Sequence, residues 1–97
     1  MLFAVLMHYT RPLADVDAIR PDHVAHLERQ AGRGVILAWA RRDPPIGAVL
    51  VAFAPDRATL ERALAEDPYV RGGVASPEIV EFPSKNVRID LRGVATG

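Results

Sequence analysis

The sequence predicts a small α+β domain whose elements follow the order βαββαβ, the order of a ferredoxin-like plait. Three observations lead to this prediction: short apolar runs of strand length, two segments with apolar residues at helical spacing, and proline or glycine at the boundaries between them. The chain has 97 residues, about one domain, and contains no repeat, linker or low-complexity segment. We therefore expect residues 1–97 to form a single domain, with a frayed tail at about residues 92–97.

The first half of the chain contains two predicted strands separated by a helix. Residues 2–9 are a continuous apolar run, which suits a strand buried on both faces. Residues 13–20 are ambiguous, because their apolar repeat is weak. Pro21 suits the first turn of a helix, and apolar residues follow it at helical spacing up to a glycine stop signal, so we expect a helix over residues 21–32. Residues 35–40 form the second strand.

The second half of the chain repeats this alternation. The Asp-Pro-Pro sequence at residues 43–45 predicts a turn, and residues 46–53 form a third strand, most simply as the hairpin partner of the second. A helix over about residues 56–66 follows, opened by an aspartate that suits the N-cap. Residues 78–82 are a predicted fourth strand. Residues 87–91 alternate between apolar and polar and would add an edge strand.

Composition excludes several classes of function. Twelve basic and twelve acidic residues cancel, so the chain has no electrostatic footprint for nucleic acid or an anionic membrane, and we expect neither as a partner. The absence of cysteine excludes disulfides and thiol nucleophiles. The apolar residues 1–7 are far fewer than the roughly 20 residues of a membrane span, and they lack the basic start of a signal peptide. A cytoplasmic location is therefore expected.

The strands that do not alternate predict a homodimer. Two helices cover only one face of a four-stranded sheet, and the other face of a monomer would be polar at alternate positions. In residues 2–7 and 49–52 both faces are apolar, and a second copy of the chain would cover the exposed patch. The alternative is that the strand at residues 87–91 folds over this face. One short strand cannot cover four, so the homodimer is favoured.

Asp67 is the acidic residue with the most unusual position. It lies three residues after Leu64 and continues the apolar stripe of the second helix, at a helix C-terminus where the dipole disfavours a carboxylate. An inward-facing acid at this place needs a donor or a cation. Alternatively, Asp67 and Pro68 are the N-cap and the first residue of a further helical turn. The position of Asp67 supports both interpretations equally.

His23 is the residue that could meet Asp67. It lies near the start of the first helix, and both helices cover the same face of the sheet in a plait. A carboxylate bonded to one imidazole nitrogen would fix the tautomer and leave the other nitrogen free to move a proton near neutral pH. The alternative is a buried histidine–aspartate hydrogen bond that only ties the two helices together.

Four further residues are candidates for binding a small-molecule substrate. His8, at the end of the first strand, could line a cleft, and Arg20 could supply positive charge at its rim. Tyr69 could hydrogen-bond a ligand, and Arg41 could favour an anionic one. The alternative interpretations are solvated side chains for the arginines and core packing for Tyr69.

Neither a metal nor a cofactor is expected. His23 and His26 are three residues apart on a helix, but no acidic residue is placed to complete a metal site with them. His26 is instead expected to be exposed to solvent. The glycines at residues 32–34 have neither the spacing nor the preceding strand of a phosphate-binding loop.

Two segments of the chain resemble the YciI-like (YCII-related) proteins. Residues 20–27, RPDHVAHL, are similar to the R-P-x-H-L-x-x-L segment of that family, and residues 67–74, DPYVRGGV, to its D-P-Y/F-x-x-x-G segment. The resemblance implies a dimeric α+β barrel. It also implies an active site built from a histidine and an aspartate, which fall here on His23 and Asp67.

The resemblance further implies a class of reaction. A lyase that removes chloride from a chlorinated hydroxymuconate resembles the family, so proton abstraction or elimination on a small carboxylated molecule is the leading hypothesis. The chain departs from the family pattern after the second strand, where residues 40–45, ARRDPP, replace a Gly-Pro and a longer hairpin. The competing hypotheses are a non-catalytic binding or accessory dimer with a structural His–Asp pair, and a protein that handles haem or a metal.

Overall fold

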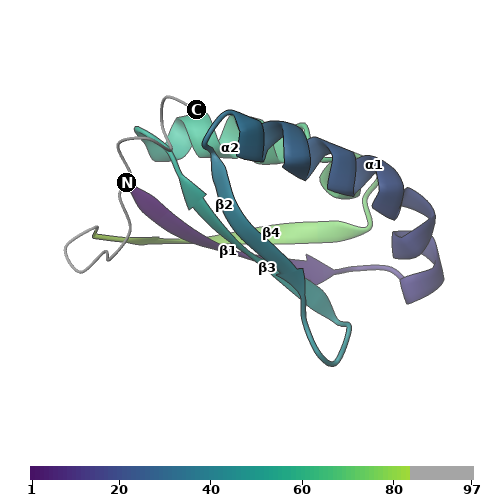
Figure 1. The fold of residues 1–97 in the computed structure, drawn as a ribbon. Coiled ribbons are helices and arrows are strands. Elements are labelled where there is room, and N and C mark those ends of the chain that lie inside the picture. The colour runs from purple at the N-terminus through teal and green to yellow at the C-terminus, as the bar shows by residue number, and fades with distance from the viewer. Residues whose placement is uncertain (84–97) are drawn as a thin grey trace.

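A computed structural model describes residues 1–83, with one layer of helices covering one face of a twisted sheet (Figure 1). This arrangement confirms the predicted α+β plait, with one short additional helix. The strand predicted at residues 87–91 and the tail predicted at residues 92–97 lie outside the described residues. The elements are, in chain order, β1 (Leu2–Tyr9), α1 (Leu13–Gly32), β2 (Ile36–Arg41), β3 (Gly47–Phe53), α2 (Arg57–Ala65), α3 (Pro68–Arg71) and β4 (Ala75–Phe82).

The four strands form one antiparallel sheet in the order β2-β3-β1-β4. The central strand β1 alternates strictly between the two faces. Phe3, Val5 and Met7 are fully buried beneath the helices, where they form the core with apolar residues of β3 and of all three helices. Tyr9 continues this inward-facing series and packs against the core. The hydroxyl group of Tyr9, at the end of β1, therefore lies on the helix-covered face of the sheet.

The first helix is longer than the sequence predicts. It begins at Leu13 rather than at Pro21, which lies inside it. The reason is that the first turns of α1 bury little: among residues 13–20 the only buried apolar side chain is Val16, and Ile19 is partly buried. The apolar repeat before Pro21 is therefore weak, although Val16 continues at helical spacing into the buried His23 and His26.

A register shift near the start of β2 determines which side chains face the helices. After the shift, Trp39 lies opposite Leu50 and Arg41 lies opposite Ala48, and these two residues of β3 are buried on the helix side. Without the shift, Trp39 would lie opposite Val49, which belongs to the other face. The irregularity therefore turns one aromatic and one cationic side chain toward the helices.

The face of the sheet that points away from the helices carries apolar side chains on its two central strands. From the two central strands, Ala4, Leu6, Val49 and Val51 alternate with the core residues and point away from the helices. Val80 on the edge strand β4 shares this face and keeps 44% of its surface exposed. Among residues 1–83, no helix is long and apolar enough to cross a membrane.

Candidate active site

His23 of α1 and Asp67, which precedes α3, meet between the helices. The Nδ1 atom of His23 lies 2.7 Å from Oδ1 of Asp67, and the two residues are only 4% and 0% exposed. Because an ionised carboxylate can only accept, we assign the proton of this hydrogen bond to Nδ1. The Nε2 atom of the neutral ring is then unprotonated and can take up a proton.

Asp67 has both of the roles that its position in the sequence left open. Its Oδ1 atom accepts a hydrogen bond from the backbone N–H of Tyr69 at 2.9 Å, and Pro68 follows as the first helical residue. The carboxylate therefore caps α3 and binds His23 at the same time. Its second oxygen, Oδ2, is buried and has no hydrogen-bond partner among residues 1–83.

Aromatic rings hold the imidazole in place. The ring of Tyr69 is stacked on that of His23, with centroids 3.6 Å apart and planes only 6° from parallel. Tyr9 in turn contacts Tyr69 edge-on, with centroids 5.9 Å apart. Burial raises the pKa of Tyr69 above its ordinary value, so the phenol stays neutral and keeps its proton for donation. The stack and the carboxylate together fix the direction in which Nε2 points.

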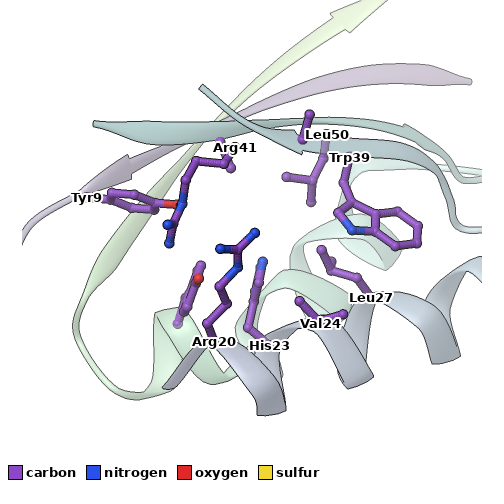
Figure 2. Close-up of a pocket in the computed structure, with 11 residues that line it drawn as sticks. Tyr9, Arg20, His23, Val24, Leu27, Trp39, Arg41 and Leu50 are labelled. Atoms are coloured by element: carbon purple, nitrogen blue, oxygen red, sulfur yellow. The ribbon is translucent and has the colours of Figure 1, made fainter. Parts of the chain in front are cut away.

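A pocket opens in front of the imidazole, between α1 and the sheet (Figure 2). Its cavity volume is about 40 Å³, which is room for a few water molecules. The exposed side chains of Arg20 and Trp39 lie at the edge of this cavity, so a larger ligand would extend from the cavity onto them. The pocket is lined by Tyr9, Arg20, His23, Val24, Leu27, Trp39, Ala40, Arg41, Ala48, Leu50 and Tyr69.

Two arginines give the pocket positive charge. Arg41 donates from Nε to the hydroxyl oxygen of Tyr9 at 3.1 Å, and its Nη2 forms an ion pair with Asp17 of α1. The hydrogen bond to Asp17 raises the pKa of Arg41, so its guanidinium is always charged. Arg20 lines the same pocket, and no carboxylate of residues 1–83 lies within ion-pair distance of it.

Among the sequence-predicted site residues, His23, Arg20, Arg41 and Tyr69 line this pocket, and Asp67 lies directly behind His23. His8 does not line it. Its side chain is 48% exposed on the sheet face away from the helices, where Nε2 lies 2.8 Å from Oε1 of Glu78. The physical reason is the alternation of β1, which turns the next residue in the chain toward the helices instead.

The expectation that His26 is exposed to solvent is wrong. His26 is only 5% exposed, and its Nε2 lies 3.2 Å from the carbonyl oxygen of Ala63. Burial lowers the pKa of His26, and this effect outweighs the attraction of the Asp67 carboxylate. The neutral ring donates to Ala63 and ties α1 to α2. Within residues 1–83, no three histidine, aspartate or glutamate side chains are grouped so that they could hold a metal ion.

Sequence reasoning missed three residues of the site. Tyr9 could have been found, because it shares a face of β1 with buried apolar residues. Asp17 lies in the part of α1 that the apolar repeat did not reveal, so its position beside Arg41 carried no signal. Trp39 depends on the register shift in β2, for which the sequence offers no cue.

A four-stranded antiparallel sheet with its helices on one face and a buried histidine–aspartate pair defines a small ferredoxin-like α+β protein. Residues 1–83 match the model of the YCII-related domain, so the chain belongs to the YCII-related family. This membership confirms the resemblance seen in the sequence. No curated protein sequence matches the chain.

Several solved structures share the fold. The 5-chloro-2-hydroxyhydroquinone dehydrochlorinase from Burkholderia phenoliruptrix AC1100, in complex with 2,5-dihydroxybenzoquinone, is 19% identical, with a TM-score of 0.65 over 86% of this chain and 94% of that one. Rv0793 from Mycobacterium tuberculosis is 11% identical, with a TM-score of 0.59 over 90% and 100%. The cofactor-independent oxygenase SnoaB from Streptomyces nogalater is 16% identical, with a TM-score of 0.51 over 92% and 96%. The dehydrochlorinase is named for a hydroquinone and not for the hydroxymuconate that the resemblance implied.

Proposed function

We propose that this protein is a lyase or isomerase for a small anionic molecule, with His23 as the acid–base group and Asp67 as its orienting partner. The observation that carries this proposal is the 2.7 Å hydrogen bond between Nδ1 of His23 and Oδ1 of Asp67. It leaves Nε2 as the proton acceptor on the pocket side of the ring (Figure 2). The dehydrochlorinase with the same fold supports an elimination on an unsaturated, oxygenated substrate.

The chemistry begins with proton transfer from an acidic C–H group of the substrate to Nε2 of His23. The resulting imidazolium is stabilised by the Asp67 carboxylate on its other nitrogen and by the stacked ring of Tyr69. In a lyase, the electron pair of the broken C–H bond forms a new double bond while a leaving group departs with its own bonding pair. In an isomerase, His23 returns the proton to a different carbon.

His23→Ala tests this role. With unsaturated acids, lactone acids and hydroxyquinones as candidate substrates, we expect turnover followed by ultraviolet absorbance to fall by about 10²–10⁴-fold, the usual contribution of a positioned acid–base group. Asp22→Asn removes an exposed polar side chain next to His23 and serves as the control that keeps wild-type turnover. Equal rates for His23→Ala and the wild-type protein would rule out the proposed acid–base role.

A second candidate function is favoured by the capping of α3 by Asp67. In a non-catalytic binding or accessory protein, the same pair would serve only to hold α1 and α3 together. That function predicts no turnover with any of the candidate substrates, and unchanged ligand binding by a folded His23→Ala variant. The assay above therefore separates the two candidates.

We also propose that two chains associate through the sheet face that the described helices leave uncovered. Ala4, Leu6, Val49 and Val51 form a continuous apolar surface over the two central strands. A soluble monomer seldom exposes such a patch. A second copy is favoured as the occupant because a twofold axis places the same apolar surface on both sides, so that each covers the other.

Val49→Glu is expected to prevent this association, because it would place two carboxylates in the apolar interface. We expect a mass of one chain by sedimentation velocity for the variant and of two chains for the wild-type protein. Leu13→Glu is a matched control, since Leu13 and Val49 are both 37% exposed, but Leu13 lies at the start of α1 and not on the sheet. A wild-type protein that sediments as a single chain would contradict the dimer.

A further inference from the structure

We propose that the pocket in front of His23 selects an amphipathic organic monoanion. Arg20 and Arg41 bind its single oxyanion, and Leu27, Leu50 and Trp39 hold an adjoining apolar group of ring size. This inference rests on the proposed function and names the substrate class of the same site. It follows from the charges, the hydrogen bonds and the burial of the residues that line the pocket.

The number of charges favours a monoanion. Arg20 and Arg41 bring two positive charges to the pocket, and Asp17, the ion-pair partner of Arg41, compensates one of them. The Asp67 carboxylate is not among the residues that line the pocket, because the imidazole stands in front of it. The two arginines and Asp17 therefore leave one net positive charge at the pocket surface, and a single carboxylate or enolate oxyanion neutralises it.

Arg41 is held in position before any ligand arrives. Its Nε is engaged by Tyr9 and its Nη2 by Asp17, which leaves other N–H groups of the planar guanidinium for a ligand. A guanidinium that is already oriented loses little conformational freedom on binding and recognises an oxyanion by geometry as well as charge. Asp17 and Tyr9 are thus positioning residues for the anion subsite.

The opposite side of the pocket is apolar. Leu27 and Leu50 are only 1% and 0% exposed and present hydrocarbon to the cavity, while Trp39 covers it at the edge with 38% of its surface exposed. A ligand ring lying on the indole would remove apolar surface from water. No described charged side chain lines this side, so a polar group there would lose its hydration without replacement.

His23 lies between the two parts of the pocket. Figure 2 shows Arg41 on one side of the imidazole and Trp39 on the other. A ligand whose oxyanion meets the arginines and whose apolar group meets Trp39 therefore places the carbons that join these groups in front of Nε2. A C–H bond next to a carboxylate or enolate carbon is where an acid–base histidine would act.

Trp39 makes the inference testable without any turnover, because it is the only tryptophan of the chain and lines the pocket. Its fluorescence is titrated with phenylacetate, an amphipathic monoanion, with 2-phenylethanol, which has the ring without the charge, and with acetate, which has the charge without the ring. We expect saturable quenching by phenylacetate, with binding at least about tenfold weaker for the other two probes, as expected when a charge-assisted contact or the ring is lost.

Arg41→Gln is expected to weaken phenylacetate binding by at least about tenfold. Arg42→Gln is the matched control, because Arg42 is the next arginine in the chain, is exposed and does not line the pocket. Arg20→Gln is a second test variant, since Arg20 is exposed and its replacement leaves the core intact. Circular dichroism melting confirms that each variant is folded.

The outcomes separate this inference from the proposed function. Equal affinities for phenylacetate and 2-phenylethanol, no saturable quenching by phenylacetate, or unchanged binding by folded Arg41→Gln and Arg20→Gln would each overturn the inference, even if His23-dependent turnover of another substrate were found. Selective phenylacetate binding that persists in His23→Ala supports the inference, even if no candidate substrate is turned over.

Discussion

Asp67→Ala is expected to lower the free energy of unfolding by about 2–4 kcal/mol. The substitution removes the N-cap of α3, which is worth about 1 kcal/mol. It also leaves the buried Nδ1–H group of His23 without an acceptor, which costs a further 1–3 kcal/mol or so. Urea denaturation followed by circular dichroism measures the sum. The loss is large because a single oxygen serves both contacts.

The chain offers a matched control for this prediction. Asp56 caps α2 through a hydrogen bond from the backbone N–H of Thr59 at 2.7 Å, but it is exposed and binds no histidine. Asp56→Ala is therefore expected to cost only about 1 kcal/mol. The excess loss in Asp67→Ala reports the contact with His23. Equal losses in the two variants would show that the His23 contact adds nothing to stability.

Gly47→Ala is expected to destabilise the protein by about 3 kcal/mol, the upper end for an overpacked site. A Cβ atom on Gly47 would overlap the carbonyl oxygen of Met7 and lie 3.2 Å from the carbonyl carbon of the same residue. These are main-chain atoms of the neighbouring strand β1, so they cannot move without disturbing the pairing of β1 with β3. Thermal unfolding followed by circular dichroism measures the effect.

Gly32→Ala provides the comparison. Gly32 is the last residue of α1, and nothing within 4 Å would meet an added Cβ atom. Alanine favours the helix and restricts the unfolded chain, so this variant is expected to match or exceed the wild-type stability by about 0.4–1 kcal/mol. Equal stability of Gly47→Ala and Gly32→Ala would contradict the close approach of the Met7 carbonyl group to Gly47.

Much of the fold could be predicted from local patterns. The apolar runs located all four strands of residues 1–83, and proline and glycine located the breaks between them. The start of α1 could not be predicted, because among residues 13–20 only Val16 is buried and Ile19 partly buried, too few positions to mark a helix face. The burial of His26 could not be predicted either, because its partner, the Ala63 carbonyl, is far away in the sequence.

The histidine and the aspartate of the site were predicted from helical phase and from the two family-like segments. The surroundings of the pair were less accessible to prediction. Whether a residue of β2 faces the helices depends on the register of β2 with β3, and one irregularity reverses the answer for Trp39 and Arg41. Alternation alone would also have misplaced His8, because it does not say which face the helices cover.

The two hydrogen bonds accepted by Asp67 also link the local unfolding of α3 to the orientation of the His23 ring. Its Oδ1 atom holds both the first turn of α3 and the imidazole, so a fluctuation that unwinds this four-residue helix also releases the ring. Local unfolding of a single short helix costs less free energy than unfolding of the whole domain, so it occurs more often. The lifetime of a correctly aligned Nε2 is then limited by the local opening rate of α3. The slow global unfolding of the domain does not set it.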